Sequence, residues 1–145
     1  MRQTVLKKLR EKLAKLDRLF EEYVSLLART YPESTILLFG SRARGNNLPY
    51  SDYDLMIIMK LRDSRDRLAE TVKAYSLKPV QLPIDLLVVD LEELDDPIVL
   101  KMLERGCVIL YDGLRIADRL ASICGKEDRL KAREGFSATL RQRVE

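Results

Sequence analysis

The chain of 145 residues contains no histidine and only two cysteines, Cys107 and Cys124, which are not in a CxxC arrangement. The absence of histidine excludes Ser-His-Asp triads, zinc deaminases and the common zinc enzymes, and it removes the usual general base. Any bound metal would therefore be a hard cation held by oxygen. The two cysteines are expected to be small buried residues rather than a disulfide or a metal site.

Long apolar runs and a strong excess of charge are also lacking. No segment is apolar enough to cross a bilayer, and the start MRQTVLKKLREKL has no signal-peptide core, so we expect a cytoplasmic protein without membrane contact. The net charge of +3 is small and the few aromatic residues are not interleaved with basic ones, so a nucleic-acid partner is not indicated. Length and a composition of 46% hydrophobic and 34% charged residues favour one globular domain, 1–145.

The N-terminal segment 4–30 is predicted to be a long amphipathic helix, stopped by Tyr31-Pro32. Its apolar residues recur at intervals of three or four: Leu6, Leu9, Leu13, Leu16, Phe20, Tyr23 and Leu27. Such a stripe is more often core than interface. Its near-heptad spacing nevertheless spans more turns than one small sheet needs to cover, which leaves room for a partner helix.

Short runs of Ile, Leu and Val alternate with helical patterns along the rest of the chain. The expected strands are 35–39, 54–59, 84–89 and 107–111, and the expected helices are 64–76, 97–104 and 114–123. This order predicts an α/β (α+β) fold, with a small mixed sheet of about four strands and helices packed on it. The polar stretch after Gly125 is interpreted as a helical C-terminus, with a partner-binding arm or a frayed end as alternatives.

The segment "FGSRARGNNLPYSDYDLMII" carries the chemistry. Residues two apart in a strand point to the same side, so Asp52 and Asp54 are expected to project together while Tyr53 faces away. Two such carboxylates repel each other unless a cation lies between them. In "PIDLLVV", Asp85 places a third carboxylate inside an apolar strand, where an unpaired charge would be costly.

If these strands are neighbours, the three carboxylates Asp52, Asp54 and Asp85 converge on one pocket. Three carboxylates without histidine can hold one or two Mg²⁺ ions. Two such ions, roughly 3.5 to 4 Å apart, can clamp the entering and leaving oxygens of a phosphoryl transfer.

Phosphate-binding groups precede these aspartates. Gly40-Ser41 follows the first strand, where a turn can open a helix and direct backbone N–H groups and the Ser41 hydroxyl at an anion. Arg42 and Arg44 come next and can neutralise phosphate charge.

The same segment resembles the signature of the nucleotidyltransferase superfamily that includes DNA polymerase beta: a hydrophobic residue, Gly-Ser, a spacer, then Asp-x-Asp between apolar residues, and a third acid on a later strand. Ten residues separate Ser41 from Asp52. The fuller form "GSRARG…SDYDL" is similar to the minimal nucleotidyltransferases of prokaryotes. The resemblance covers about residues 35–89, more loosely to 111, and implies a polymerase beta-like fold with its catalytic core at about 31–112.

The resemblance implies roles for individual residues. Ser41 would bind the outer phosphates of a nucleotide, with Gly40 allowing their close approach, and Arg44 is a candidate contact to a phosphate or to the leaving group. Asp52 and Asp54 would hold two Mg²⁺ ions, and Asp85 would ligate the catalytic metal and help to deprotonate the attacking hydroxyl.

The resemblance also implies an activity and a partner. The expected reaction moves a nucleoside monophosphate, AMP from ATP by preference, to a hydroxyl acceptor and releases pyrophosphate. No acceptor-binding domain is evident, so the acceptor is expected to be small or brought by another chain. One candidate is a tyrosine of an all-helical HEPN-type toxin, with this protein as the antitoxin; a homo- or hetero-oligomer is compatible with this.

Other interpretations of the same residues remain open. Asp52 and Asp54 can belong to a solvated turn, Asp85 can be an edge-strand or salt-bridged residue, and the two arginines can be solvated charges. At the level of the whole protein, the alternative is a non-catalytic module that binds and neutralises a helical partner. A nucleic-acid-binding protein that uses basic residues of both termini is the least supported alternative.

Overall fold

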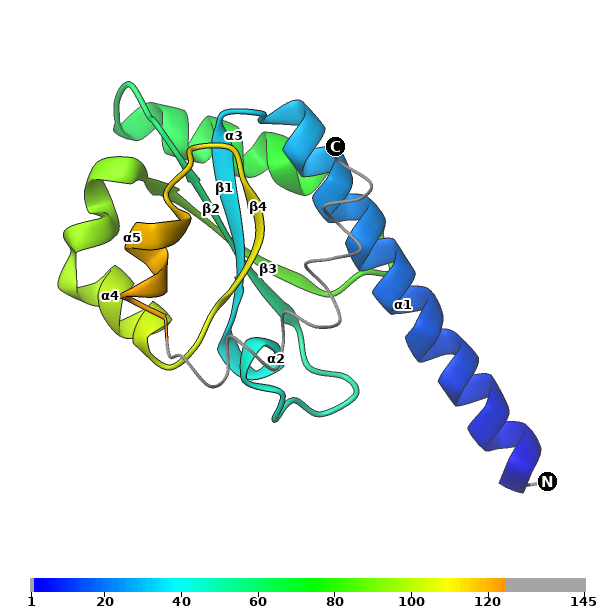
Figure 1. Cartoon of the computed structure of the whole chain (residues 1–145). Helices are drawn as coiled ribbons and strands as arrows, with labels where there is room; N and C mark the ends of the chain where they lie inside the picture. The colour runs from blue at the N-terminus through cyan, green and yellow to red at the C-terminus, as the bar shows by residue number, and fades with distance from the viewer. Residues whose placement is uncertain (1, 125–145) are drawn as a thin grey trace.

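A mixed four-stranded sheet forms the centre of the computed structural model, which describes residues 2–124 (Figure 1). The strands are β1 (Ser34–Phe39), β2 (Tyr53–Met59), β3 (Ile84–Asp90) and β4 (Val108–Asp112), in the spatial order β3-β2-β1-β4. β1 pairs antiparallel with both β2 and β4, whereas β2 and β3 are parallel. The predicted α/β (α+β) fold with a small mixed sheet is confirmed.

The helices surround the sheet. They are α1 (Arg2–Thr30), α2 (Gly40–Arg44), α3 (Ser64–Ser76), the 3₁₀ helix η1 (Leu91–Asp95), α4 (Pro97–Glu104) and α5 (Ala117–Ala121). Helix α3 follows β2 and crosses back to the parallel strand β3, as parallel pairing requires. In residues 2–124, no helix is long and apolar enough to cross a bilayer.

Both faces of the sheet are buried, which explains the nearly continuous apolar strands. On one face, α1 and α3 cover side chains from β1 and β2: Ile36, Leu38, Leu55 and Ile57. On the other face, η1, α4 and α5 cover Leu37, Met56, Ile58 and Val89. Odd and even residues of β1 and β2 therefore belong to different cores, as the two-residue period of a strand requires.

Helix α1 is divided between core and surface. Phe20, Tyr23 and Leu27 are fully buried against the sheet, and the Tyr23 hydroxyl donates a hydrogen bond of 2.6 Å to the Ala74 carbonyl in α3. Toward the N-terminus the helix projects away from the sheet (Figure 1), and Val5 and Leu6 are at least half exposed. The amphipathic stripe is thus core only in its C-terminal part.

The last described helix is shorter than the sequence predicted. The expected helix 114–123 is reduced to α5, Ala117–Ala121, with a turn before it and single hydrogen-bonded turns after it. The helix starts late because the Asp112 carboxylate accepts hydrogen bonds of 3.0 Å from the backbone N–H groups of Ile116 and Ala117. The predicted helical C-terminus lies outside the described residues.

The prediction for the cysteines was wrong, because Cys107 and Cys124 form a disulfide. Both residues are buried, as expected, but their Cα atoms are 5.3 Å apart and the bond links the start of β4 to the segment after α5. The intervening strand, turn and helix bring the chain back on itself, and a separation of 17 residues does not reveal that path.

Candidate active site

The site begins where β1 ends and α2 starts. Gly40, the first residue of α2, has a φ of 73°, which is unfavourable for residues with a side chain. It also lies directly against Asp54 in the adjacent strand β2: a Cβ atom on Gly40 would be 2.9 Å from the Asp54 Cγ atom. Glycine is therefore required for two independent reasons, backbone conformation and space.

Two of the predicted acidic residues are brought together by strand pairing. Asp54 and Asp85 are opposite each other in the parallel register of β2 and β3. Asp54 is also paired with Phe39, the residue just before α2. Since Asp54 shares its side of the sheet with Met56 and Ile58, the site opens on the face covered by α4 and α5.

Asp52 precedes β2 rather than lying within it, because the strand begins at Tyr53. The carboxylates of both Asp52 and Asp85 belong to exposed residues, while Asp54 is half-buried. Asp85 lies in the apolar strand β3, as predicted, but it is the second residue of that strand and is exposed, so the expected cost of burying its charge does not arise.

The three carboxylates interact electrostatically. Burial raises the pKa of the Asp54 carboxyl above its ordinary range, and the charges of Asp85 and Asp52 raise it further. The Arg44 guanidinium acts in the opposite direction and lowers the same pKa. Asp54 is thus the centre of a negative cluster that a cation would stabilise.

The carboxylates of Asp52, Asp54 and Asp85 are chemically suited to a divalent cation, since carboxylate oxygens are the ligands that Mg²⁺ prefers. Within residues 2–124, however, no three acidic or sulfur-bearing side chains are arranged closely enough to hold one ion. Asp52 and Asp85 are exposed side chains that can change rotamer, so ligation by all three requires them to turn toward Asp54.

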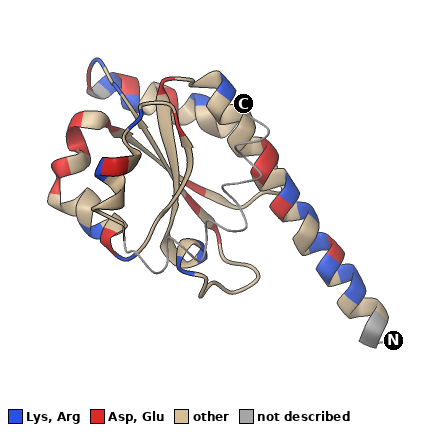
Figure 2. Cartoon of the chain, viewed as in Figure 1, with Lys and Arg blue, Asp and Glu red and all other residues tan. Residues whose placement is uncertain are grey.

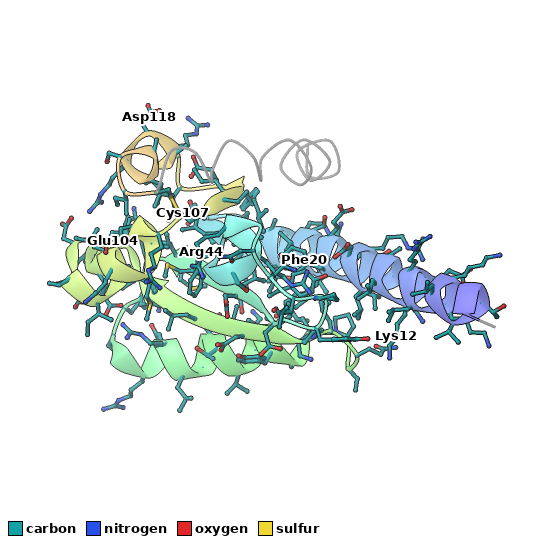
Figure 3. All side chains as sticks on the ribbon, turned by 90° about the horizontal axis from the view of Figure 1, so that it is seen from below. Lys12, Phe20, Arg44, Glu104, Cys107 and Asp118 are labelled. Carbon is teal, nitrogen blue, oxygen red and sulfur yellow. A yellow bond between two sulfur atoms is a disulfide. The ribbon has the colours of Figure 1, made fainter. Side chains whose placement is uncertain are left out.

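Ser41 and Arg44 lie in α2, which Gly40 begins. Ser41 is half-buried in the first turn, and no side chain caps that turn. Arg44 is half-buried as well, and with Phe39 and Gly40 it lines a groove of about 630 Å³ whose opposite wall is α4. Figure 3 shows Arg44 near Glu104 of α4, far from Lys12 on the projecting part of α1.

Arg42 points elsewhere. Its Nε atom donates a hydrogen bond of 2.9 Å to the Ser51 carbonyl, and a second nitrogen donates one of 3.2 Å to the Pro49 carbonyl. Its guanidinium lies 3.9 Å from the centroid of the Tyr53 ring, on the side of the sheet that α1 covers. In this conformation Arg42 holds the loop before β2 instead of facing the acids.

Tyr53 faces away from the acids, as predicted, and connects the site to α1. Its ring stacks on Phe20 with a centroid distance of 4.2 Å, and its hydroxyl donates a hydrogen bond of 2.5 Å to an Asp17 carboxylate oxygen. The sequence signal was the alternation of buried Tyr53 with Asp52 and Asp54, but the identity of its partners depends on how α1 packs.

Comparison with known proteins agrees with this architecture. The model of the nucleotidyltransferase domain family matches residues 16–134, which is most of the chain and includes all the candidate site residues. The protein therefore belongs to the nucleotidyltransferase domain family. None of the curated proteins searched matches its sequence.

A solved structure has the same fold. It is described as a "putative nucleotidyltransferase" from Sulfolobus solfataricus, is 23% identical in sequence, and superposes with a TM-score of 0.54. The similarity covers 72% of this chain and 86% of that chain. At this identity the likeness concerns the fold alone.

Proposed function

We propose that the protein is a Mg²⁺-dependent enzyme that transfers AMP from ATP to a hydroxyl acceptor and releases pyrophosphate. The observation that carries this proposal is the position of Asp54, which lies against Gly40 at the start of α2 and is influenced by the charges of Asp85 and Asp52. The turn that we propose to bind phosphate thus lies against the acidic cluster, an arrangement that suits a phosphoryl-transfer reaction.

In the proposed reaction the acceptor oxygen forms a bond to the α-phosphorus of ATP. The bond from that phosphorus to the oxygen that bridges to the β-phosphorus breaks, and its electron pair leaves with pyrophosphate. The proton of the acceptor hydroxyl passes to the exposed Asp85 carboxylate and then to solvent. Bound Mg²⁺, held by Asp52, Asp54 and Asp85, would neutralise phosphate charge and increase the acidity of the acceptor hydroxyl.

The residues of α2 serve binding in this scheme. Ser41 and the backbone N–H groups of its turn, which no N-cap side chain engages, bind phosphate oxygens, and Gly40 keeps the backbone close to Asp54. Arg44 lies near enough to Asp54 to lower its pKa and can neutralise phosphate charge on the same side.

We also propose that the acceptor is carried by a protein partner, with a tyrosine of a HEPN-type toxin as the specific candidate and antitoxin as the biological role. The projecting half of α1, with Val5 and Leu6 exposed, supports contact with another helix. The same observation favours the second candidate function, a module that neutralises its partner by binding without turnover.

A transfer assay tests the proposal. The protein is incubated with Mg²⁺ and ATP labelled at the α-phosphate, with and without a candidate partner, beside the variant Asp52→Asn/Asp54→Asn. The transferase is supported if the wild type labels an acceptor and the variant does not. The control is Asp118→Asn, which removes an exposed acid of α5 remote from the site and should leave transfer unchanged (Figure 3).

The two candidate functions give opposite results with the same variant. One possible result is that Asp52→Asn/Asp54→Asn folds, binds the partner and neutralises it as well as the wild type does. If the wild type also forms no labelled product with any of the four nucleotides, binding alone accounts for the function. The transferase proposal would then be abandoned.

A further inference from the structure

The groove between α2 and α4 is lined by positively charged side chains that the proposed roles leave largely unused. Its walls consist of Phe39, Gly40 and Arg44 on one side and Ile98, Lys101, Met102, Glu104 and Arg105 on the other. Its volume of about 630 Å³ lies in the range of small-molecule sites. Figure 2 shows basic positions both in α2 and near the C-terminal end of α4.

Helix α4 has two distinct faces. Val99 and Leu103, four residues apart, are buried in the core under the sheet. The groove-lining residues recur at the same intervals on another face of the helix: Ile98, Lys101, Met102 and Arg105. Because the core contacts fix the rotation of α4, Lys101 and Arg105 project together toward α2.

The position of α4 is fixed at both ends. At its start, the Asp96 side chain accepts a hydrogen bond of 2.8 Å from the Ile98 backbone N–H, and Pro97 occupies the first turn. Beyond its end, Cys107 is joined to Cys124 by the disulfide. The second wall of the groove is therefore held by core contacts, an N-terminal cap and a crosslink just beyond its end.

The groove is continuous with the acidic cluster. Gly40 lines the groove and also lies against Asp54, and Arg44, which follows Gly40 in the same short helix, lines the groove as well. A phosphate chain whose first phosphorus lies beside Asp54 would cross Gly40 and continue toward α4.

The charges of the groove favour an anion. Arg44, Lys101 and Arg105 are cations, Glu104 is an anion, and the excess is positive. Among the described residues none of the three cations is in an ion pair. The side chains of Ile98 and Met102 line the same groove beside these cations.

We propose that this groove binds the terminal phosphates of the nucleoside triphosphate, and the pyrophosphate formed from them, through Lys101 and Arg105 together with Arg44. This inference rests on the proposed transferase function and adds α4 to the substrate-binding site. The α-phosphate lies at the acidic cluster, the β- and γ-phosphates lie over Gly40 and in the groove, and α4 holds the leaving group.

The test measures the binding of inorganic pyrophosphate by titration calorimetry to the wild type and to Lys101→Ala/Arg105→Ala. Both side chains are exposed, so the variant should fold, and circular dichroism verifies this. Its affinity should fall by about tenfold or more. The charge-matched control Lys7→Ala/Lys8→Ala removes two exposed cations from the projecting part of α1 and should bind as the wild type does.

A second variant, which removes a negative charge, is expected to have the opposite effect on binding. Glu104→Gln removes the anion from the groove and should strengthen pyrophosphate binding about twofold, because it removes a repulsion. Equal affinities for pyrophosphate in the wild type, Lys101→Ala/Arg105→Ala and the α1 control, or no pyrophosphate binding by the wild type, would overturn the assignment.

Transfer kinetics separate this inference from the proposed function. If the wild type transfers AMP, the KM for ATP and the inhibition constant for pyrophosphate should both rise about tenfold in Lys101→Ala/Arg105→Ala. Active transfer with both constants unchanged rejects the groove and leaves the transferase standing. A third result is that the wild type binds pyrophosphate but transfers nothing, and that the variant loses this binding. That result supports the groove as a pyrophosphate site and rejects the transferase.

Discussion

Gly40 of α2 and Asp54 of β2 are in such close contact that a Cβ atom on Gly40 would lie 2.9 Å from the Asp54 Cγ atom. The family resemblance explains this glycine by the approach of phosphates to the backbone. The geometry adds a second reason, because the missing side chain leaves the space that the candidate metal-binding carboxylate occupies. Turn and acid therefore constrain each other before any ligand binds.

Gly40→Ala should be more damaging than Gly45→Ala. Both glycines have a similar positive φ, 73° and 76°, so both substitutions carry the same backbone penalty of about 1 to 2 kcal/mol. A Cβ at Gly45 meets nothing within 4 Å, whereas at Gly40 it meets Asp54. Urea denaturation should therefore show a loss of about 1 kcal/mol for Gly45→Ala and about 3 kcal/mol for Gly40→Ala.

The same pair of variants separates stability from activity. Gly40→Ala displaces Asp54 and should reduce nucleotide transfer by more than tenfold at a temperature where the variant is folded, while Gly45→Ala should keep most of it. Equal losses of stability and activity in the two variants would show that only the backbone conformation matters and that the contact with Asp54 does not.

Asp54→Asn should stabilise the metal-free protein at neutral pH. Burial and the charges of Asp85 and Asp52 raise the pKa of Asp54 in the folded state above the value of 3.8 expected for the unfolded chain. Between these two values the folded state binds more protons, so the free energy of unfolding falls as the pH rises through that interval. The ionised carboxylate is thus destabilising at neutral pH, and the amide of asparagine removes this negative charge.

Thermal unfolding in the presence of a chelator, recorded from pH 4 to pH 8, checks this sign. The melting temperature of the wild type should fall relative to that of Asp54→Asn as the pH rises, and Mg²⁺ should raise it for the wild type alone. Glu22→Gln, an exposed acid on α1, is the control and should follow the wild type. If the melting temperature of the wild type instead rises relative to that of Asp54→Asn as the pH rises, the pKa of Asp54 is not raised.

Local patterns predicted most of the fold. The helices α3 and α4 have the predicted bounds, and each predicted strand is found within one residue at either end. The periods of 3.6 and 2 residues carry this information directly. The 3₁₀ helix η1 was not predicted, because a single turn held by Asp90 and Glu93 leaves no periodic signal.

Long-range features could not be predicted in the same way. The sequence placed Asp54 and Asp85 in separate strands, and only the parallel register puts them opposite each other. The exposure of Asp85 depends on which end of β3 is open to solvent, and the disulfide depends on the path from β4 through α5. In each case the deciding contacts join residues far apart in the chain.

Reduction of the disulfide should destabilise the protein. The bond between Cys107 and Cys124 closes a loop of 17 residues, and crosslinks of this size typically contribute about 3 kcal/mol. Denaturant unfolding with and without reductant should show a loss of this order. Cys107→Ala/Cys124→Ala should be insensitive to reductant, and an equal response of that variant would assign the effect to another cause.

Arg42 should contribute to stability and Arg44 to substrate binding, although the sequence pattern predicts a phosphate contact for both. Arg42 donates to the Ser51 and Pro49 carbonyls and lies 3.9 Å from the Tyr53 ring centroid. Arg42→Ala should therefore lower the free energy of unfolding by about 1 to 2 kcal/mol. Arg44 is half-buried, faces the groove and acts on Asp54, so Arg44→Ala should leave stability nearly unchanged and weaken ATP binding about tenfold.

The comparison requires both measurements on both variants, by denaturation and by ATP titration, with Arg42→Lys as a third protein. Lysine keeps the charge but cannot reproduce the two directed hydrogen bonds and the flat contact with Tyr53, so Arg42→Lys should resemble Arg42→Ala in stability. Because the loop 46–51 leads directly into Asp52, its release should also reduce transfer while ATP affinity changes little. A large loss of ATP affinity in Arg42→Lys, with stability intact, would instead show that Arg42 turns toward the nucleotide when it binds.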